Sequence, residues 1–201
     1  MEAIFVVLLF LIFMLLWGIK RARQKKLTGV DPLVMSKSTS NVQVFLSRFS
    51  DLLMIYAAVI ILAHAVHIQA GSLFSRSDLF SSVMFDLTGF AAGLAGLSLC
   101  LYAQLKMGES WRVGIDEKIR TQLITTGLYQ FIRNPTYLGI ILLNIGVWLI
   151  WPTWTIFLLN ILFTLFLEIQ VRCEEDYLTL VHREEYMEYK KRTKRYLPYI
   201  Y

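Results

Sequence analysis

Four stretches of this sequence run almost without charged side chains. Residues 3–19 and 137–167 contain none, 52–70 contains none apart from two histidines, and 79–105 contains only Asp86. A helix needs roughly 20 apolar residues to cross about 30 Å of bilayer hydrocarbon. With 56% hydrophobic residues and a mean hydropathy of +0.54, the chain is too apolar for an ordinary soluble domain. The sequence therefore predicts an integral membrane protein.

The last charge-free stretch is too long for one span, and a tight turn would divide it into two. Trp151-Pro152-Thr153-Trp154 supplies that turn, because Trp is typical of membrane interfaces and Pro breaks helices. Five spans are thus expected, at about 3–19, 52–70, 79–104, 137–150 and 154–170. The fold class predicted is all-α: a polytopic membrane protein of about five transmembrane helices, with a helical hairpin and a cytosolic amphipathic C-terminal helix.

Two amphipathic segments flank the predicted spans. Residues 42–49 are mildly amphipathic, so we expect a short interfacial segment before the second span. Residues 173–190 can form a helix whose apolar side carries Leu178, Val181, Tyr186 and Tyr189. We expect this C-terminal helix to begin at the end of the fifth span and to cover a cytosolic cavity.

Positive charge is divided unevenly among the loops. The segments after the first, third and fifth predicted spans hold 7, 5 and 7 Lys and Arg residues, whereas the loop between the second and third spans holds only Arg76. The positive-inside rule places the richer side in the cytoplasm, so we expect the N-terminus outside and the C-terminus inside. Because the basic cluster follows the first span, we expect an uncleaved anchor and not a signal peptide.

The same charges limit which partners we expect for the chain. Basic segments beside membrane spans attract anionic lipids, which we expect to be partners of this protein. The net charge of +5 then needs no nucleic acid to account for it. The oligomeric state is not predicted by the sequence.

A compact group of polar residues stands at the start of the predicted hairpin. The hairpin is followed by Glu174-Glu175 and by a basic tail that ends with Arg195 and Pro198. A lipid-facing helix has no use for an Arg, an Asn and two tyrosines so close together, so we expect the active site at this membrane boundary. The segment itself reads Gly127-Leu128-Tyr129-Gln130-Phe131-Ile132-Arg133-Asn134-Pro135-Thr136-Tyr137-Leu138-Gly139.

Together these segments resemble the isoprenylcysteine carboxyl methyltransferase and phospholipid methyltransferase superfamily of integral membrane enzymes. Its members typically carry Gly-x-Tyr-x-x-x-Arg-His-Pro-x-Tyr-x-Gly, a helical hairpin, then Glu-Glu-x-x-Leu-x-x-x-Phe-Gly-x-x-Tyr-x-x-Tyr and a closing Arg-x-x-Pro. The resemblance covers roughly residues 105–201. The residues that match are Gly127, Tyr129, Arg133, Pro135, Tyr137, Gly139, Glu174, Glu175, Leu178, Tyr186, Tyr189, Arg195 and Pro198.

The resemblance implies S-adenosylmethionine as methyl donor, bound between the cytosolic end of the hairpin and the C-terminal segment. Aromatic faces attract a cationic sulfonium, which suits Tyr129 and Tyr137. The ammonium and the ribose hydroxyls of the cofactor need acceptors, which suits Glu174 or Glu175. We therefore expect one membrane-embedded domain over 1–201, with three N-terminal spans in 1–104 and the cofactor-binding half in 105–201.

The cofactor's carboxylate needs a hydrogen-bond donor. Backbone N–H groups in the turn from Ile124 to Gly127 would serve, and so would Arg133. The residues implied as catalytic are Arg133, Glu174 and Glu175. Those implied as cofactor contacts are Ile124, Gly127, Tyr129, Asn134, Tyr137, Glu174 and Glu175.

Three positions depart from the family pattern. Asn134 stands where the family has His, and an amide makes hydrogen bonds but cannot titrate, so we expect it to hold cofactor or backbone. His182-Arg183 replaces Phe-Gly. Gln170 occupies the place, four residues before the first Glu, where members acting on isoprenylcysteine often carry an Arg that pairs with the substrate carboxylate.

The predicted function is methyl transfer from S-adenosylmethionine to a lipophilic or prenylated acceptor, as in isoprenylcysteine carboxyl methyltransferases. A phospholipid amine or a small thiol is the alternative acceptor. A non-catalytic membrane protein or a transporter that retains the fold is the alternative of another class. A transporter is expected to show broken helices or repeats, and a degenerate enzyme is expected to lose Arg133 or the Glu pair; the sequence shows neither sign.

Other polar residues lie within the predicted spans. No metal site is expected, because the sequence has no Cys-x-x-Cys motif and no Cys/His cluster. Asp86, His64 and His67 stand near the outer ends of their spans, and we expect Asp86 to find water or a polar partner. Asn144 and Asn160 predict a hydrogen bond across the hairpin.

Overall fold

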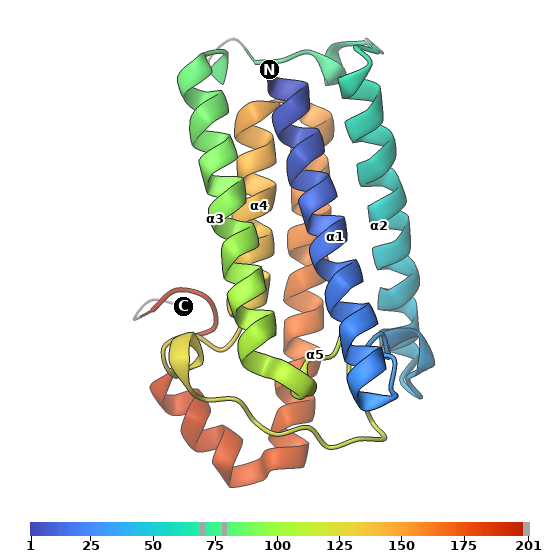
Figure 1. Ribbon diagram of the computed structural model, residues 1–201, viewed down its shortest axis with the longest axis vertical. Helices are drawn as coiled ribbons and strands as arrows, with labels where there is room; N and C mark the ends of the chain where they lie inside the picture. The colour runs from blue at the N-terminus through green and yellow to red at the C-terminus, as the bar shows by residue number, and fades with distance from the viewer. Residues whose placement is uncertain (69–70, 78–79, 199–201) are drawn as a thin grey trace.

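The protein is a bundle of long helices. A computed structural model describes residues 1–68, 71–77 and 80–198. Within these ranges the helices are α1 (Glu2–Thr28), α2 (Asn41–Ala65), α3 (Val83–Met107), α4 (Pro135–Ile150) and α5 (Trp154–Arg192), joined by the short 3-10 helices η1 (Met35–Lys37), η2 (Ser72–Phe74), η4 (Gly108–Ser110) and η5 (Gly127–Gln130). Figure 1 shows the five long helices standing side by side. The predicted all-α polytopic fold is confirmed.

Helix length supports a multi-pass membrane protein. Helices α1, α2, α3 and α5 are long and apolar enough to cross a bilayer, and α4 is a shorter apolar helix of 16 residues. At 1.5 Å per residue, α4 rises about 24 Å, which is less than the roughly 30 Å of bilayer hydrocarbon. The hairpin α4–α5 is therefore short on one side, as its sequence indicates.

Several predicted boundaries need correction. Helix α1 continues to Thr28, well past residue 19. Residues 42–49, expected as a separate interfacial segment, are the first turns of α2, so that prediction was wrong. Apolar side chains at the start of α2 pack on α5 inside the bundle, with Leu46 almost fully buried, and they favour one continuous helix. Residues 70 and 79, where two predicted span ends fall, lie outside the described residues.

Glycines bring α3 and α4 into close contact. A Cβ on Gly89 would lie 2.6 Å from the carbonyl oxygen of Gly146, and a Cβ on Gly139 would lie 2.6 Å from the carbonyl oxygen of Gly96. Real Cβ atoms do not approach so closely, so both helices need glycine at the crossing. Small residues allow this packing in membrane helices.

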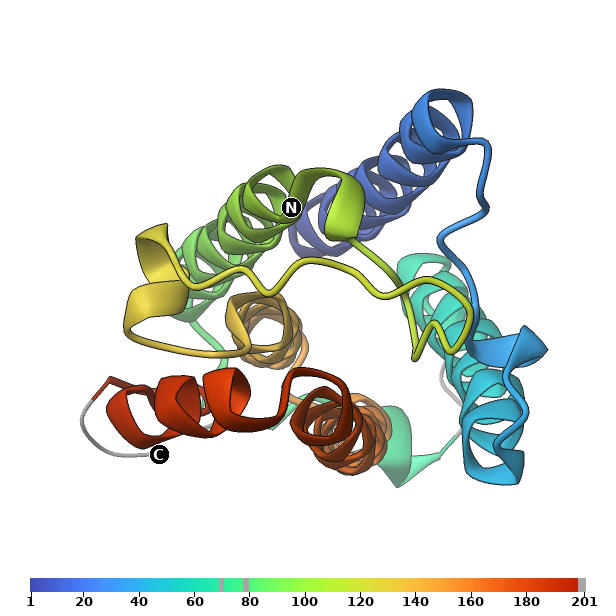
Figure 2. The same ribbon diagram turned by 90° about the horizontal axis from the view of Figure 1, so that it is seen from below.

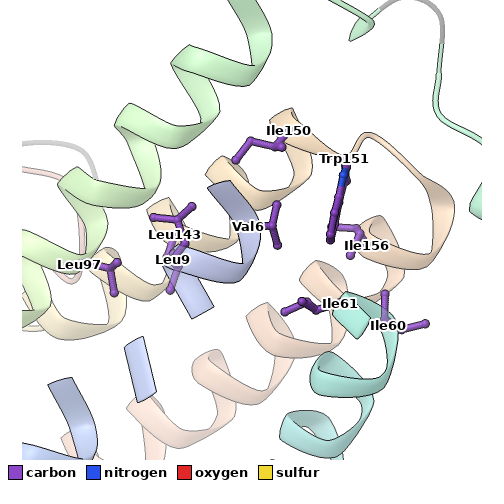
Figure 3. Close-up of a cluster of buried hydrophobic side chains, with 9 residues drawn as sticks. All are labelled: Val6, Leu9, Ile60, Ile61, Leu97, Leu143, Ile150, Trp151 and Ile156. Atoms are coloured by element: carbon purple, nitrogen blue, oxygen red, sulfur yellow. The ribbon is translucent and has the colours of Figure 1, made fainter. Parts of the chain in front are cut away.

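A buried apolar cluster holds the other helices to this pair (Figure 3). Val6 and Leu9 of α1 are fully buried and face α3 and α4. Trp151 and Ile156, at the turn of the hairpin, close the cluster toward α2. The members are Val6, Leu9, Ile60, Ile61, Leu97, Leu143, Ile150, Trp151 and Ile156.

Helix α5 has two parts that meet at Arg183. Thr153 caps its start by accepting a hydrogen bond from the backbone N–H of Ile156. The helix then runs without interruption through residue 173, where we expected a separate C-terminal helix to begin. The chain changes direction at Arg183 instead, whose φ of 47° and ψ of −119° are not helical. In Figure 2 the part beyond this point lies across the end of the bundle. The predicted start of the C-terminal helix was therefore wrong by ten residues.

Two loops and the C-terminal part of α5 gather at one end of the bundle, which we call the basic end (Figures 1 and 2). It holds residues 29–40, 108–134 and 172–198. The two loops meet where the backbone N–H of Val113 donates to Pro32 O at 2.9 Å and the N–H of Val34 donates to Val113 O at 3.1 Å. The C-terminal segment meets the hairpin where the N–H of Arg133 donates to Lys194 O at 2.8 Å.

Candidate active site

A cavity of about 500 Å³ opens at the basic end, between α1, α2, α4 and α5. Its volume lies in the usual range for small-molecule sites, about 300–1,000 Å³. The loop of residues 111–124 contributes to its wall and crosses this end of the bundle in Figure 2. One part of the wall is apolar and includes Phe13, Met14, Trp17, Met54, Phe163 and Phe166. The other part is polar and includes Arg133, Asn134, Tyr137, Gln170 and Glu174.

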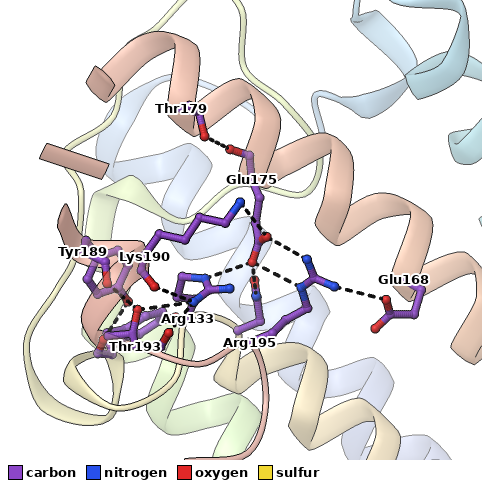
Figure 4. Close-up of polar contacts among 10 residues, drawn as sticks. Arg133, Glu168, Glu175, Thr179, Tyr189, Lys190, Thr193 and Arg195 are labelled. Atoms are coloured by element: carbon purple, nitrogen blue, oxygen red, sulfur yellow. Dashed lines mark hydrogen bonds and ion pairs between the residues drawn. The ribbon is translucent and has the colours of Figure 1, made fainter. Parts of the chain in front are cut away.

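Glu175 stands at the centre of an ion-pair cluster beside the cavity (Figure 4). Arg133 Nε donates to Glu175 Oε1 at 3.0 Å, Arg195 Nη2 donates to Oε2 at 2.9 Å, and Lys190 Nζ lies 3.6 Å from Oε2. Burial opposes ionisation of Glu175, but the hydrogen bonds and charges of Arg195 and Arg133 lower its pKa. The cluster joins the start of α4, the middle of α5 and the C-terminal segment, and it holds the backbone around Arg133 in place.

Arg133 is fixed by more than one bond. Its Nη1 also donates to the carbonyl oxygen of Thr193 at 2.6 Å, and only 9% of its side chain is exposed. Asn134 Nδ2 lies 3.5 Å from Glu175 Oε1, at the outer limit of a hydrogen bond. Its backbone N–H donates to Arg195 O at 3.1 Å. Both residues line the cavity as well as contacting the cluster.

Glu174 has very different surroundings from Glu175. Its Oε1 accepts hydrogen bonds from Tyr137 Oη at 2.7 Å and from Gln170 Nε2 at 2.9 Å. Its side chain lines the cavity, and no cation of the described residues forms an ion pair with it. Glu174 lies beyond the charge-free part of α5, and burial raises its pKa although Gln170 and Tyr137 act in the other direction.

A chain of amides links Glu174 to the loop over the cavity. Gln43 Nε2 donates to Gln170 Oε1 at 3.0 Å, and the backbone N–H of Ile115 donates to Gln43 Oε1 at 3.3 Å. Both glutamines are 1% exposed. The direction of each bond is fixed, because the Ile115 N–H can only donate and the bond to Glu174 uses an N–H of Gln170. Gln43 is not among the residues predicted for the site, because its one signal in the sequence is an amide within an apolar helix face.

The loop before α4 is positioned by tyrosines and by a turn at Gly127. Gly127 has a φ of 69°, a conformation that favours glycine. Tyr129 is 6% exposed, and Tyr189 Oη donates to its carbonyl oxygen at 2.6 Å. The turn therefore places Tyr129 in the wall of the cavity. The C-terminal part of α5 holds the backbone of Tyr129 through Tyr189.

The structure brings most of the predicted site residues to one cavity. Gly127 and Glu175 are not among its lining residues; one shapes the turn and the other holds the cluster. Residues of α1 and α2 form part of the wall, which the family motifs do not indicate. The predicted residues that line the cavity are Ile124, Tyr129, Arg133, Asn134, Tyr137 and Glu174.

The polar residues at the opposite end of the bundle have partners of their own. Asp86 pairs with Arg76 at 2.5 Å, and Arg76 also pairs with Glu2, so the expected polar partner of Asp86 is an arginine. His64 Nε2 lies 3.0 Å from Thr155 Oγ1, and the His64 ring stacks on the ring of Trp151. Among residues 1–68, 71–77 and 80–198, no group of three His, Cys, Asp or Glu side chains is placed to hold a metal.

The predicted contact across the hairpin is confirmed. Asn160 Nδ2 donates to the backbone oxygen of Asn144 at 3.0 Å. The bond is therefore between a side chain and a carbonyl group, not between two side chains. It joins α4 and α5 within the apolar part of the hairpin.

The chain is similar to known membrane methyltransferases. Residues 86–185, about half of the chain, match the model of the phospholipid methyltransferase family. The chain is also 31% identical over 126 residues to human protein-S-isoprenylcysteine O-methyltransferase, an alignment that covers 57% of this chain and 42% of the human protein. The chain thus spans less than half the length of that relative. It belongs to the superfamily of integral membrane methyltransferases that includes the phospholipid and isoprenylcysteine enzymes.

Proposed function

We propose that this protein transfers a methyl group from S-adenosylmethionine to a lipophilic acceptor, at the cytosolic end of the bundle. The observation that carries the proposal is Glu174, an acid that lines the cavity, stands beside Tyr137 and is paired with no cation among the residues that the structure describes. An uncompensated buried anion is costly unless a cation comes to it. The cofactor offers such a cation in its ammonium group.

The other lining residues suit the rest of the cofactor. Tyr129 and Tyr137 supply aromatic faces near which a sulfonium is stabilised. Arg133 lines the cavity and pairs with Glu175. Its guanidinium would attract the cofactor's carboxylate.

When bound here, S-adenosylmethionine would supply a methyl group on a cationic sulfur for in-line displacement by the acceptor. The protein's own task is then to fix positions and to exclude water, which supplies a large share of such rate enhancements. Glu174 is held by two hydrogen bonds, and Arg133 by the Glu175 cluster. The polar wall is thus rigid before ligands arrive.

The apolar wall suits an acceptor that comes from the bilayer. Phe13 and Trp17 of α1 face the same cavity as Met54 of α2 and Phe163 of α5. An acyl or isoprenoid chain would lie against these side chains with its reacting group toward Tyr137 and Glu174. In the proposed orientation the basic end faces the cytosol, so the cofactor and the acceptor arrive from different phases.

Calorimetric titration of the purified full-length protein with S-adenosylmethionine tests the proposal. We expect saturable binding that Glu174→Gln weakens by about 1.5–3 kcal/mol, the size of a hydrogen bond to a charged group. Glu184→Gln is the matched control, because Glu184 is an exposed acid of the same helix and should leave affinity unchanged. If the wild-type protein binds no cofactor, or if the two variants bind it equally, the proposal fails.

A further inference from the structure

We infer that Gln43 is a positioning residue of the proposed cofactor site: through Gln170 it determines which end of an amide group faces Glu174. This role rests on the proposed function, in which Glu174 receives the cofactor's ammonium group. It involves α2, a helix that lies outside the residues matched to the methyltransferase family. Gln43 is not among the lining residues of the cavity, so it acts through other side chains.

The side chains of Gln43 and Gln170 form a pair of facing amides between α2 and α5. Gln43 Nε2 donates to Gln170 Oε1 at 3.0 Å, and Gln170 Nε2 lies 3.4 Å from Gln43 Oε1. Each side chain is 1% exposed, so water cannot easily replace these contacts. Because a buried amide without a partner is strongly unfavourable, each glutamine keeps the other in place.

The backbone of the loop over the cavity fixes the direction of this pair. The N–H of Ile115 donates to Gln43 Oε1 at 3.3 Å, and a backbone N–H can only donate. Gln43 therefore turns its oxygen toward Ile115 and offers its Nε2 to Gln170. Gln170 then keeps its oxygen toward Gln43 and donates from its own Nε2 to Glu174 Oε1 at 2.9 Å. Hydrogen bonds that run in one direction polarise and strengthen one another.

This direction favours the ionised form of Glu174. A carboxylate accepts the N–H of Gln170, whereas the oxygen of a reversed Gln170 would repel a carboxylate and accept from a protonated carboxyl group. Burial raises the pKa of Glu174, and the bond from Gln170 opposes that rise. Gln43 is the donor that the described residues offer to Gln170 Oε1. Without Gln43, the amide of Gln170 would be free to reverse.

The other titratable groups near Glu174 leave this role to the amides. Tyr137 of α4 donates to Glu174 Oε1 at 2.7 Å, and the neighbouring Glu175 disfavours a second anion. Three further groups have raised pKa values and are neutral at pH 7: Tyr129, Cys173 and Tyr186. The arginines that line the cavity each pair with another carboxylate: Arg21, Arg112 and Arg133. In the described part of the chain, Tyr137 and Gln170 are therefore the donors that stabilise the charge of Glu174.

Titration of Glu174 in the free protein tests this role without any cofactor. Protonation is followed by the infrared carbonyl band of the neutral carboxyl group, which is assigned to Glu174 by its loss in Glu174→Gln. Gln43→Met keeps the length of the side chain and removes both polar atoms. As the pH is lowered, we expect the band to appear at a higher pH in Gln43→Met than in the wild type. An unchanged titration would overturn the inference.

Gln104→Met is the matched control. Gln104 is also a helical glutamine with 1% of its side chain exposed, but its polar atoms have no hydrogen-bond partner among the described residues. It does not line the cavity. This variant should leave the titration of Glu174 unchanged. An equal shift in both variants would show that the loss of any buried amide is sufficient, and would exclude a specific role for Gln43.

Calorimetric titration with S-adenosylmethionine relates the amide pair to binding. At pH 7.5 we expect Gln43→Met to weaken affinity by about two- to tenfold, the scale of one neutral hydrogen bond, and Gln104→Met to leave it unchanged. Equal affinity of Gln43→Met and the wild type would contradict the inference alone. A wild-type protein that binds no cofactor would refute the proposed function, and the infrared titration would still decide the role of Gln43.

Hydrogen exchange in the wild-type protein gives a test that requires no variant to fold. Because coupling between sites is reciprocal, bound S-adenosylmethionine should stabilise the amide chain and slow exchange at the N–H of Ile115. The N–H of Val113 is the control, since it lies in the same loop but donates to Pro32 O at 2.9 Å. We expect the cofactor to protect Ile115 more than Val113. Equal protection of both would indicate simple covering of the loop and would overturn the inference.

Discussion

At the scale of single residues, two adjacent glutamates show how neighbours decide the role of a side chain. Glu175 is surrounded by three cations, whereas the polar partners of Glu174 in the described part of the chain are a tyrosine hydroxyl and an amide. The pKa of Glu175 is lowered and that of Glu174 is raised. A pair of carboxyl groups with pKa values moved in opposite directions is typical of sites that divide structural and chemical roles.

This difference predicts how cofactor affinity depends on pH. Because burial raises the pKa of Glu174 above its ordinary value, Glu174 should begin to take up a proton at a higher pH than an exposed glutamate does, as the pH is lowered from 7.5 toward 5. The pKa of Glu175 is lowered from 4.5, so Glu175 stays ionised over this range. The ion pairs that it forms are lost only at lower pH. Affinity for S-adenosylmethionine should therefore fall over this range, by at most about tenfold per pH unit, since binding would require loss of one proton.

Glu174→Gln is the control for this pH dependence. The amide cannot titrate, so the variant should bind the cofactor weakly and almost equally at pH 7.5 and pH 5. Calorimetry of both proteins across the range provides the comparison. A wild-type affinity that does not change between these pH values would contradict the role given to Glu174.

Arg183 gives a prediction about stability. Its φ of 47° is unusual for a residue other than glycine, and conformations of this kind cost about 1–3 kcal/mol. Since the side chain is exposed, Arg183→Gly should relieve strain and raise the thermal unfolding midpoint, by an amount equivalent to about 1 kcal/mol. Arg183→Ala keeps the Cβ and should show no such gain. Thermal unfolding of the three proteins in the same detergent is the measurement, and an equal midpoint in all three would exclude strain at this position.

At the scale of elements, the crossing of α3 and α4 depends on backbone contact. A Cβ on Gly89 would meet Gly146 O at 2.6 Å, Ile150 Cγ1 at 2.9 Å and Leu149 Cβ at 3.0 Å. Because two of these atoms cannot move away without shifting α4, Gly89→Ala should destabilise the protein by about 1–3 kcal/mol. Gly89 is remote from the basic end, so the effect should appear in stability and not in cofactor affinity.

Gly18→Ala is the matched control for the crossing. Gly18 also lies within a long helix, but a Cβ there would meet nothing within 4 Å. Alanine favours helix by about 1 kcal/mol over glycine, so this variant should be as stable as the wild type or more so. Denaturant unfolding in detergent compares the two, and equal loss of stability in both would rule out a specific contact at Gly89.

The elements also show what the sequence could predict. Charge-free stretches predicted the spans, because the bilayer requires apolar length and little else. They could not predict where helices end, since helices α1, α2 and α5 extend beyond their charge-free stretches, where they contact other segments. Gln24 is an example: its Nε2 donates to Glu109 O and to Trp111 O, contacts more than 80 residues away in sequence.

The site was predictable to a similar extent. The two motifs identified the polar wall, because those residue types at that spacing serve one chemistry. The partners of Gln170 and the apolar wall on α1 and α2 could not be predicted, since they depend on how the N-terminal helices pack. Of the departures from the family pattern, His182-Arg183 falls at the change of direction in α5, where a Gly would adopt the conformation that Arg183 holds.

At the scale of the whole molecule, the two ends of the bundle differ in charge. All Lys and Arg residues except Arg76 lie toward the basic end, where the cavity opens. At the other end Arg76 pairs with Glu2 and Asp86, so the one arginine there is neutralised. A membrane protein with this distribution is expected to keep the basic end in the cytoplasm.

Cysteine labelling tests this orientation. In a background carrying Cys100→Ala and Cys173→Ala, one single cysteine is placed by Lys26→Cys in the last turn of α1, next to the basic end, and another by Ser72→Cys near the opposite end, both at exposed positions. A maleimide that cannot cross membranes should label Ser72→Cys in intact cells and Lys26→Cys only after permeabilisation. The charge rule gives this result because translocating a segment with many Lys and Arg residues is unfavourable. Labelling of Lys26→Cys in intact cells would place the cavity outside, where cytosolic S-adenosylmethionine does not reach it, and would refute both the orientation and the proposed route of the cofactor.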